Sequence, residues 1–180
     1  VGVVGGGTMG NGIAHVAARS GLKVVLHDVE RQQLDKAVAT IAGNLDREVA
    51  KGKISKDDKS AALSRIVPTA DYAPLAEADF VIEAVSEDLG IKSKVLQALD
   101  EIARPNAILA SNTSSISITA IAAGTKHPGR VVGMHFFNPA PILPLVEVVS
   151  GLATERNVAE VVYATSLAWG KVPVHARSTP

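Results

Sequence analysis

Three polar side chains in the last third of the sequence have the types and spacing that acid–base chemistry needs. His135 lies near the end of the apolar run Val131–Phe137, Asn138 follows that run directly, and Glu147 comes twelve residues after the histidine. A histidine titrates near neutral pH, and a carboxylate beside it can orient its ring. His135 is therefore the best candidate for a general base among the five histidines.

The other four histidines have plainer interpretations. His15 falls within an expected helix, as a surface or packing residue, and His27 is expected to point away from any site on its strand. His127 is part of a Lys-His-Pro-Gly turn and should be solvated, and His175 comes close to the end of the chain.

Two further groups of polar residues follow apolar segments. Glu83 and Glu87 come at and after the end of Asp79–Val85, and the run 111–115 (Ser-Asn-Thr-Ser-Ser) closes the next apolar segment. In open α/β sheets, ligands bind beyond the carboxyl ends of the strands. We therefore expect these residues to line a binding site.

Each of these residues also has a structural interpretation. Glu83 could satisfy backbone amides as a buried carboxylate, and Glu87 could favour the N-terminus of the next helix. Ser114 could cap the helix that follows it, and Lys92 could simply be solvated. A basic group at Arg47, Lys51 and Lys53 is either a solvated helix face or a site for anionic phosphates.

A glycine motif near the start predicts a dinucleotide site. Gly5, Gly7 and Gly10 form G-x-G-x-x-G between an apolar strand and a helix, and Asp28 ends the next strand. Gly5 permits the tight turn, Gly7 admits a pyrophosphate, and Gly10 allows close packing of helix on strand. Asp28 can accept hydrogen bonds from ribose hydroxyls and would repel a 2′-phosphate, which favours NAD over NADP. Arg31 lies nearby and leaves the NADP alternative open.

The elements that must position these residues alternate between strand and helix. Strands are predicted at 1–5, 22–28, 66–68, 79–85, 107–111, 131–137, 145–150 and 171–175. Helices are predicted at 8–20, 30–51, 61–65, 91–103, 116–123 and 155–169, with a helix-start signal at 55–58. Alternation of this kind predicts an α/β, Rossmann-type doubly wound fold, with a mostly parallel sheet and helices on both faces.

The composition bounds the class of protein. The 180 residues are 47% hydrophobic, so they can form one sizeable core. The 18 basic and 18 acidic residues balance, which argues against a nucleic-acid partner. There is no cysteine, which fits a cytoplasmic location, and we expect no metal site, no membrane span and no signal peptide.

Together the motifs resemble the 3-hydroxyacyl-CoA dehydrogenase family, over essentially the whole chain. The resemblance is carried by five segments in the family's order: 5–10 (GGGTMG), 83–87 (EAVSE), 111–115 (SNTSS), 135–139 (HFFNP) and 145–148 (LVEV). Within the family, the segments 115–123, 148–154 and 169–171 are similar to the 3-hydroxyadipyl-CoA dehydrogenases of bacterial phenylacetate breakdown. The 3-hydroxybutyryl-CoA dehydrogenases are the alternative.

The resemblance implies roles for individual residues. His135 would remove the 3-hydroxyl proton of the acyl-CoA, Glu147 would orient the ring, and Ser114 and Asn138 would hold the substrate oxygen as further catalytic residues. Lys51, from the basic group described above, is the further candidate for substrate binding, beside Ser114 and Asn138. NAD would be bound by Gly5, Gly7, Thr8, Met9, Gly10, Asp28, Ala84, Val85, Glu87, Lys92, Asn112, Ser114 and Asn138.

The resemblance also implies a second domain. The family carries a helical C-terminal domain that mediates dimerisation and supplies part of the cleft, and residues 1–180 correspond to the NAD-binding domain alone. We therefore expect a fragment that binds NAD but turns over acyl-CoA far more slowly than a full-length homodimer. The alternative functions are a non-catalytic NAD-binding protein and a dehydrogenase of free hydroxy acids.

Overall fold

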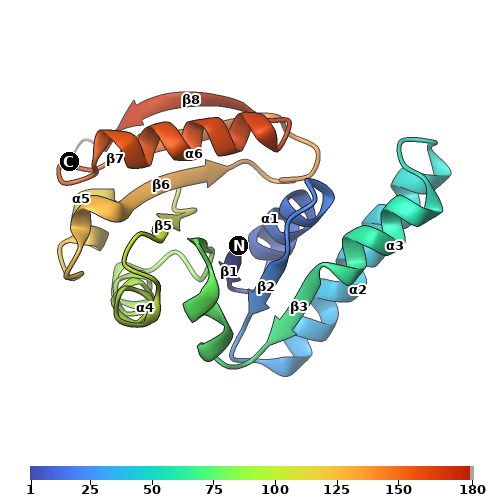
Figure 1. Ribbon diagram of the computed structural model, residues 1–180, viewed down its shortest axis with the longest axis horizontal. Helices are drawn as coiled ribbons and strands as arrows, with labels where there is room; N and C mark the ends of the chain where they lie inside the picture. Colours follow the sequence, from blue (N-terminus) through green and yellow to red (C-terminus); the bar gives the residue numbers. More distant parts are fainter. Residues whose placement is uncertain (179–180) are drawn as a thin grey trace.

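Strands and helices alternate along residues 1–178, the part of the chain that the computed structural model describes (Figure 1). The strands are β1 (Gly2–Val4), β2 (Val24–His27), β3 (Ile66–Thr69), β4 (Phe80–Glu83), β5 (Ile108–Ser111), β6 (Val131–Phe136), β7 (Leu145–Ser150) and β8 (Val172–Arg177). The α-helices are α1 (Thr8–Arg19), α2 (Arg31–Ala50), α3 (Lys56–Ser64), α4 (Leu89–Ile102), α5 (Ile118–Ala122) and α6 (Arg156–Ala168). Two 3₁₀ turns, η1 (Ala73–Glu77) and η2 (Pro128–Arg130), complete the set.

The strands form one sheet in the order β3-β2-β1-β4-β5-β6-β7-β8. Neighbouring strands are parallel except for the antiparallel pair β6 and β7. From β1 the chain proceeds outward to β2 and β3, then returns to β4 on the other side of β1. The order of the strands therefore reverses between β1 and β4, and such a switch point is where open α/β sheets bind ligands.

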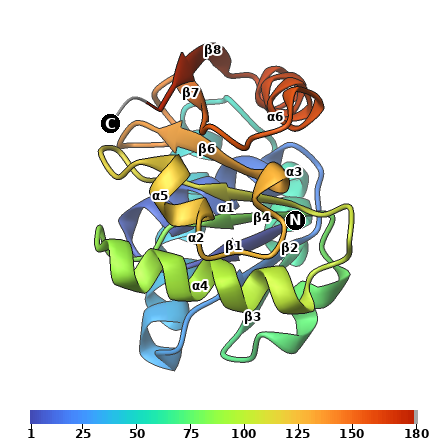
Figure 2. The ribbon, with the colours of Figure 1, turned by 90° about the vertical axis from the view of Figure 1, so that its left-hand side faces the viewer.

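Helices cover both faces of this sheet, as the Rossmann-type prediction required (Figure 2). On one face, α1, α2 and α6 bury a large core against alternate strand residues such as Val3, Leu26 and Val132. On the other face, α4 and α5 pack on the intervening residues, including Val4 and Leu109. Because successive strand residues point to opposite faces, a continuous apolar strand serves both cores at once.

The clearest differences from the predicted elements concern α3 and the turn η1. The helix-start signal at 55–58 is confirmed, because Ser55 and Asp58 form a capping box, and α3 therefore begins at Lys56, before the helix expected at 61–65. The turn η1 was not predicted, since a single short turn with Pro74 at its start has too little apolar periodicity to mark it. Within residues 1–178 no helix combines the length and apolarity of a membrane span, and no group of three or more side chains is placed to hold a metal.

Candidate dinucleotide and catalytic site

The glycine motif forms a turn that brings α1 against β1. Gly5 adopts φ +105°, a conformation that favours glycine, and a Cβ there would lie 2.6 Å from the carbonyl oxygen of Ala84. A Cβ on Gly10 would lie only 1.7 Å from the carbonyl oxygen of Gly5. By contrast, a Cβ on Gly7 would meet no atom within 4 Å. The motif therefore needs Gly5 and Gly10 for the fold, while the space over Gly7 is open to a ligand.

The residues of this turn fit a pyrophosphate. Gly7 is the N-cap of α1 and brings no side chain to the free amides of the first turn, where Thr8, Met9 and Gly10 lie. No acidic residue lies in that turn. Uncapped amides at the positive end of a helix dipole, beside a position with no Cβ, are the features that bind a phosphate group.

Asp28 is tied to the glycine loop from the end of β2. Its Oδ2 accepts a hydrogen bond of 2.7 Å from the Gly6 amide, and its Oδ1 accepts one of 2.9 Å from the Glu30 amide. Gln33 donates to the carbonyl oxygen of Gly6 at 3.0 Å. The loop is thus held in shape by Asp28 and Gln33 on either side of Gly6.

A groove of about 500 Å³ runs across the switch point between β1 and β4. It is lined by the glycine loop, by Asp28, and by Ala84 and Val85 from the β4–α4 connection. The Ala84 amide donates to the Val4 carbonyl oxygen at 2.7 Å, which holds the two connections together. The groove therefore joins three of the segments expected to bind the cofactor.

His135 and Glu147 face each other across the antiparallel pair β6 and β7. The Nδ1 of His135 lies 2.8 Å from the Oε2 of Glu147, and the ring packs on Phe137 with centroids 4.5 Å apart. His135 is mostly buried, while Glu147 is 37% exposed. A carboxylate on Nδ1 favours the tautomer with the proton there, which leaves Nε2 as the nitrogen able to accept another proton.

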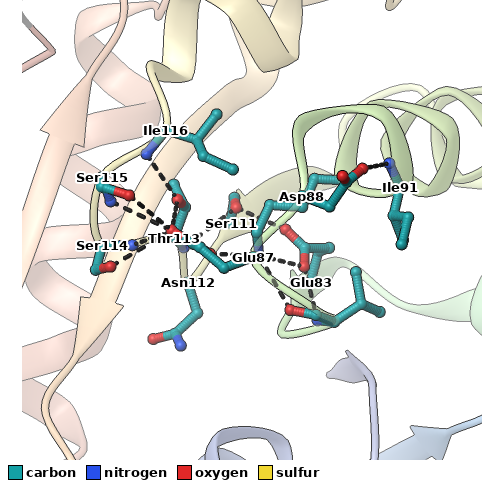
Figure 3. A network of polar contacts seen from close by, with 12 residues as sticks. Glu83, Glu87, Asp88, Ile91, Ser111, Asn112, Thr113, Ser114, Ser115 and Ile116 are labelled. Carbon is teal, nitrogen blue, oxygen red and sulfur yellow. Dashed lines mark hydrogen bonds and ion pairs between the residues drawn. The ribbon is translucent and has the colours of Figure 1, made fainter.

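The serine loop, residues 113–115, is held by Glu87 (Figure 3). The Oε1 of Glu87 accepts hydrogen bonds from the Thr113 hydroxyl at 2.5 Å and from the amides of Ser114 and Ser115 at 3.0 and 3.3 Å. Burial alone would raise the pKa of Glu87, but the bonds from Thr113 and Ser114 and the charge of Lys92 lower that pKa to about 2. Glu87 is therefore ionised at neutral pH and fixes the loop as an anion.

The remaining predicted site residues lie around the same edge. Ser114 and Glu147 line a common hollow of about 220 Å³, and Asn138 lines a second one with Gly6 and Thr8. The Oδ1 of Asn112 accepts a hydrogen bond of 2.8 Å from the Phe136 amide, which joins the end of β5 to β6. Catalytic and cofactor candidates from distant parts of the sequence thus converge.

The basic group lies farther out, at the end of α2. Arg47, Lys51 and Lys53 line a groove of about 400 Å³ that also contacts the loop carrying Pro139. Lys51 is exposed, and so its side chain is open to an anionic ligand.

Comparison with protein families identifies the family of this chain. The family model described as 3-hydroxyacyl-CoA dehydrogenase, NAD binding domain, matches residues 1–179. The chain belongs to this family. NAD is accordingly the cofactor of the domain, as the glycine motif and Asp28 predicted.

Characterised relatives of this 3-hydroxyacyl-CoA dehydrogenase domain include two kinds of enzyme. The chain is 49% identical over its whole length to a 3-hydroxyadipyl-CoA dehydrogenase of Escherichia coli, of which it covers 38%. It is 50% identical over 160 residues to a 3-hydroxybutyryl-CoA dehydrogenase of Bradyrhizobium diazoefficiens, covering 89% of the chain and 55% of the relative. The chain thus spans between about a third and two thirds of the length of such relatives.

Solved structures agree on the fold. The crystal structure of (S)-3-hydroxybutyryl-CoA dehydrogenase from Ralstonia eutropha superposes with a TM-score of 0.97 at 46% identity, over 99% of this chain and 63% of that one. This likeness confirms the Rossmann-type fold and the family resemblance.

Two of the structural alternatives for single residues of the dehydrogenase domain are excluded. Ser114 does not cap the next helix, because the N-cap of α5 is Ser117. The N-cap of α4 is Asp88, whose carboxylate accepts from the Ile91 amide, and Glu87 lies one residue before it, so the alternative that Glu87 favours this N-terminus stays open. Lys92 is not solvated. Its side chain is 1% exposed, and its ammonium contacts Glu83 and Glu87, so a contact between Lys92 and the cofactor stays a prediction.

The histidines also differ from expectation in part. His27 is 1% exposed and packs on Tyr72 with centroids 4.3 Å apart, on the wall of the groove rather than away from it. Of the two interpretations of His15, the packing one is confirmed, because the side chain is buried and contacts the Glu48 carboxylate at 3.0 Å. His127 is 63% exposed, as its turn indicated.

Sequence reasoning missed some residues that shape the dehydrogenase site. Gln33 supports Gly6, and Asn11 donates to the Gly7 carbonyl oxygen at 2.8 Å. The signal for Asn11 was its place one turn into the helix that follows the motif. No sequence signal marked Gln33 or Tyr72, whose positions depend on how separate elements pack.

Proposed function

We propose that this domain serves the NAD-dependent oxidation of a (3S)-3-hydroxyacyl-CoA to the 3-oxoacyl-CoA. The observation that carries the proposal is the His135–Glu147 pair, whose ring nitrogen and carboxylate oxygen are 2.8 Å apart at the edge of the sheet that also bears the glycine loop. Neither a non-catalytic NAD-binding protein nor a structural relative requires such a pair. Bound NAD supplies the acceptor for the hydride that leaves C3.

Four side chains of the domain serve the proton transfer and the positioning of the substrate. His135 removes the proton of the 3-hydroxyl group through Nε2, since its Nδ1 is engaged by Glu147. Glu147 holds the ring in place and stabilises the imidazolium that forms. Ser114 lines a hollow with Glu147, Asn138 lines another with Thr8, and both donate hydrogen bonds to the substrate oxygen.

Turnover of substitution variants of the full-length protein tests this assignment. His135→Gln should lower kcat at least about 10²-fold, because a positioned base typically contributes about 10²–10⁴-fold. Glu147→Gln should also lower kcat, and the two changes together should cost far less than the product of the separate losses, because the pair acts as a unit. NAD affinity should stay nearly constant in all three variants.

A matched control is His127→Gln, which alters an exposed histidine ahead of η2, at the opposite end of β6. It should leave kcat unchanged. Near-normal turnover of His135→Gln would place the base elsewhere and refute the assignment.

The finer assignment is 3-hydroxyadipyl-CoA as substrate, in phenylacetate breakdown. It is supported by 49% identity to the Escherichia coli 3-hydroxyadipyl-CoA dehydrogenase over all 180 residues, against 160 aligned residues for the Bradyrhizobium enzyme. Comparing kcat/KM for 3-hydroxyadipyl-CoA and 3-hydroxybutyryl-CoA tests it, and a preference for the shorter acyl chain favours the second relative. We further propose a cytoplasmic homodimer whose contacts lie in a C-terminal domain, with the basic groove at Lys51 receiving the phosphates of CoA.

A further inference from the structure

Glu83, the last residue of β4, joins three separate elements although it is fully buried. Its Oε1 accepts hydrogen bonds from the Lys92 ammonium at 2.8 Å and from the Val85 amide at 2.7 Å. Its Oε2 accepts one from the Ser111 hydroxyl at 2.6 Å. In the sheet it lies in register with Val4 on one side and Ser111 on the other. Glu83 is therefore fixed at the centre of the sheet, beside the switch point.

Lys92 connects Glu83 to the site. Its ammonium, which α4 carries into the interior, lies 3.3 Å from the Oε2 of Glu87 and donates to the Val85 carbonyl oxygen at 3.2 Å. One buried cation is thus shared by two carboxylates, of which Glu83 is fully buried and Glu87 is 41% exposed. The position of the ammonium depends on both of them.

Glu87 connects Lys92 to the serine loop. Its other oxygen, Oε1, is the one that binds Thr113, Ser114 and Ser115 (Figure 3). A second route leads from Glu83 to the same loop, because the Ser111 hydroxyl also accepts from the Thr113 amide at 3.3 Å. Two paths of hydrogen bonds therefore start at Glu83 and end at the loop that carries Ser114.

Stability alone does not account for such a network. A buried ion pair is often no more stabilising than apolar residues of similar volume, since desolvation offsets the attraction between the charges. A fully satisfied polar network does, however, specify one arrangement of the groups that it joins. The location of this network, between the cofactor groove and the serine loop, suits a role in specifying geometry.

We propose that Glu83 is a positioning residue of the cofactor site, which acts through Lys92 and Glu87 to fix the serine loop beside the groove. The inference rests on the proposed function for the importance of Ser114, but its test is cofactor binding rather than turnover. Without the charge of Glu83, the Lys92 ammonium is free to move toward Glu87. The movement draws Glu87 away from the amides of Ser114 and Ser115.

The test compares NAD dissociation constants, measured by calorimetry, for the parent chain and for Glu83→Gln, Glu87→Gln and the double variant. Glutamine keeps the size of Glu83 and its contact with Ser111 but removes the charge. Each single change should weaken NAD binding at least fivefold. The double variant should bind NAD no more than twofold less tightly than Glu87→Gln, because a residue that acts through Glu87 has no separate effect once Glu87 is altered.

A matched control is Glu101→Gln on α4, the helix that also carries Lys92. This change removes an exposed ion pair between Glu101 and Lys126 and should leave NAD affinity unchanged. Amide NMR signals of Ser114 and Ser115 add a readout that needs no cofactor, and both should shift in Glu83→Gln. A purely structural role for Glu83 would lower the unfolding midpoint while leaving those signals and the NAD affinity unchanged, which overturns the proposal. Independent, multiplying losses in the double variant overturn it as well.

Glu83→Asp covers the case in which the neutral variant does not fold. It keeps the buried charge but shortens the side chain, so NAD affinity should fall two- to fivefold, and parent-like affinity would refute the inference. The proposed function fails separately: a full-length protein that binds NAD but oxidises no 3-hydroxyacyl-CoA leaves this comparison intact.

Discussion

Substitution of Gly10 by alanine tests whether the glycine loop is built for close approach of α1 to β1. A Cβ on Gly10 would lie 1.7 Å from the Gly5 carbonyl oxygen and 2.8 Å from its carbonyl carbon. Since non-bonded heavy atoms settle about 3.5–4 Å apart, the helix and the turn must separate by about 2 Å. Both colliding atoms belong to the backbone, so no side-chain rotation relieves the contact.

The loss of stability expected for Gly10→Ala is at the upper end of the range for overpacked sites. Inserting one methyl group into a tightly packed region typically costs about 1–3 kcal/mol, and the rigidity of the two backbones supports a loss of at least about 3 kcal/mol here. Gly10→Ala should therefore lower the free energy of unfolding by this amount. NAD binding should fall to an undetectable level, because the amides of the first helical turn move with α1.

Two glycines provide matched controls. Gly7→Ala places its methyl group where no protein atom lies within 4 Å, and the backbone at Gly7, φ −64° and ψ −170°, suits alanine. This variant should fold as well as the parent but bind NAD at least about tenfold more weakly, because the methyl group occupies space expected for the pyrophosphate. Gly43→Ala, inside α2 with no neighbour within 4 Å, should raise stability by about 0.5–1 kcal/mol.

Chemical denaturation and calorimetry with NAD measure the two effects separately. The decisive pattern is loss of folding in Gly10→Ala and loss of binding alone in Gly7→Ala. If Gly10→Ala has the stability and NAD affinity of the parent, close packing at Gly10 is not what the motif requires, and the reasoning is refuted.

Three further predictions concern charge. Asp28→Ala should narrow the preference for NAD over NADP, and equal affinities of the parent for the two cofactors, measured by calorimetry, would contradict the assignment. Asp100→Asn leaves the buried Arg130 guanidinium without the carboxylate that now lies 2.7 Å away, so the free energy of unfolding should fall by about 3–5 kcal/mol in urea titrations. A loss under 1 kcal/mol would show that water replaces the pair. Burial lowers the pKa of His27, with the Ala70 carbonyl opposing the shift, so below about pH 6.5 the unfolded state takes up a proton that the folded state resists. Stability should therefore decrease as the pH falls below that value, and His27→Phe should flatten the dependence by up to about 1.4 kcal/mol per pH unit. Parallel pH profiles for parent and variant would exclude His27 as the cause.

Much of the fold could be predicted because local patterns encode it. Buried parallel strands require unbroken apolar runs, and helices on both faces require apolar stripes at helical spacing, so the alternation along the chain indicates the Rossmann-type sheet. The glycine motif indicates by residue type where a side chain cannot fit. The 1.7 Å distance between a Cβ on Gly10 and the Gly5 carbonyl oxygen confirms this requirement. Helix ends were less predictable, as α5 shows, because it begins at Ile118 after the cap of Ser117 rather than at residue 116.

The candidate site was predicted as a set of residues but not as a set of contacts. The sequence predicted that Glu87, Ser114 and His135 lie at or after the ends of strands. Because β4, β5 and β6 are neighbours in the sheet, these three residues come to one side of it. Which oxygen of Glu87 binds which amide, and that Lys92 is buried between two carboxylates, depends on the path of α4 across the sheet. A lysine is normally exposed, so no local pattern could predict its burial.

By itself, the sequence determined the class of fold, the dinucleotide loop and the identity of the residues able to do chemistry, because these depend on residue type and on short spacings. The tertiary structure alone decided how those residues pair. His135 meets Glu147 because β6 and β7 are antiparallel with these two residues in register, and a shift of one residue would have turned one of them to the other face. Register of this kind is fixed by the packing of both cores together, which no single segment contains.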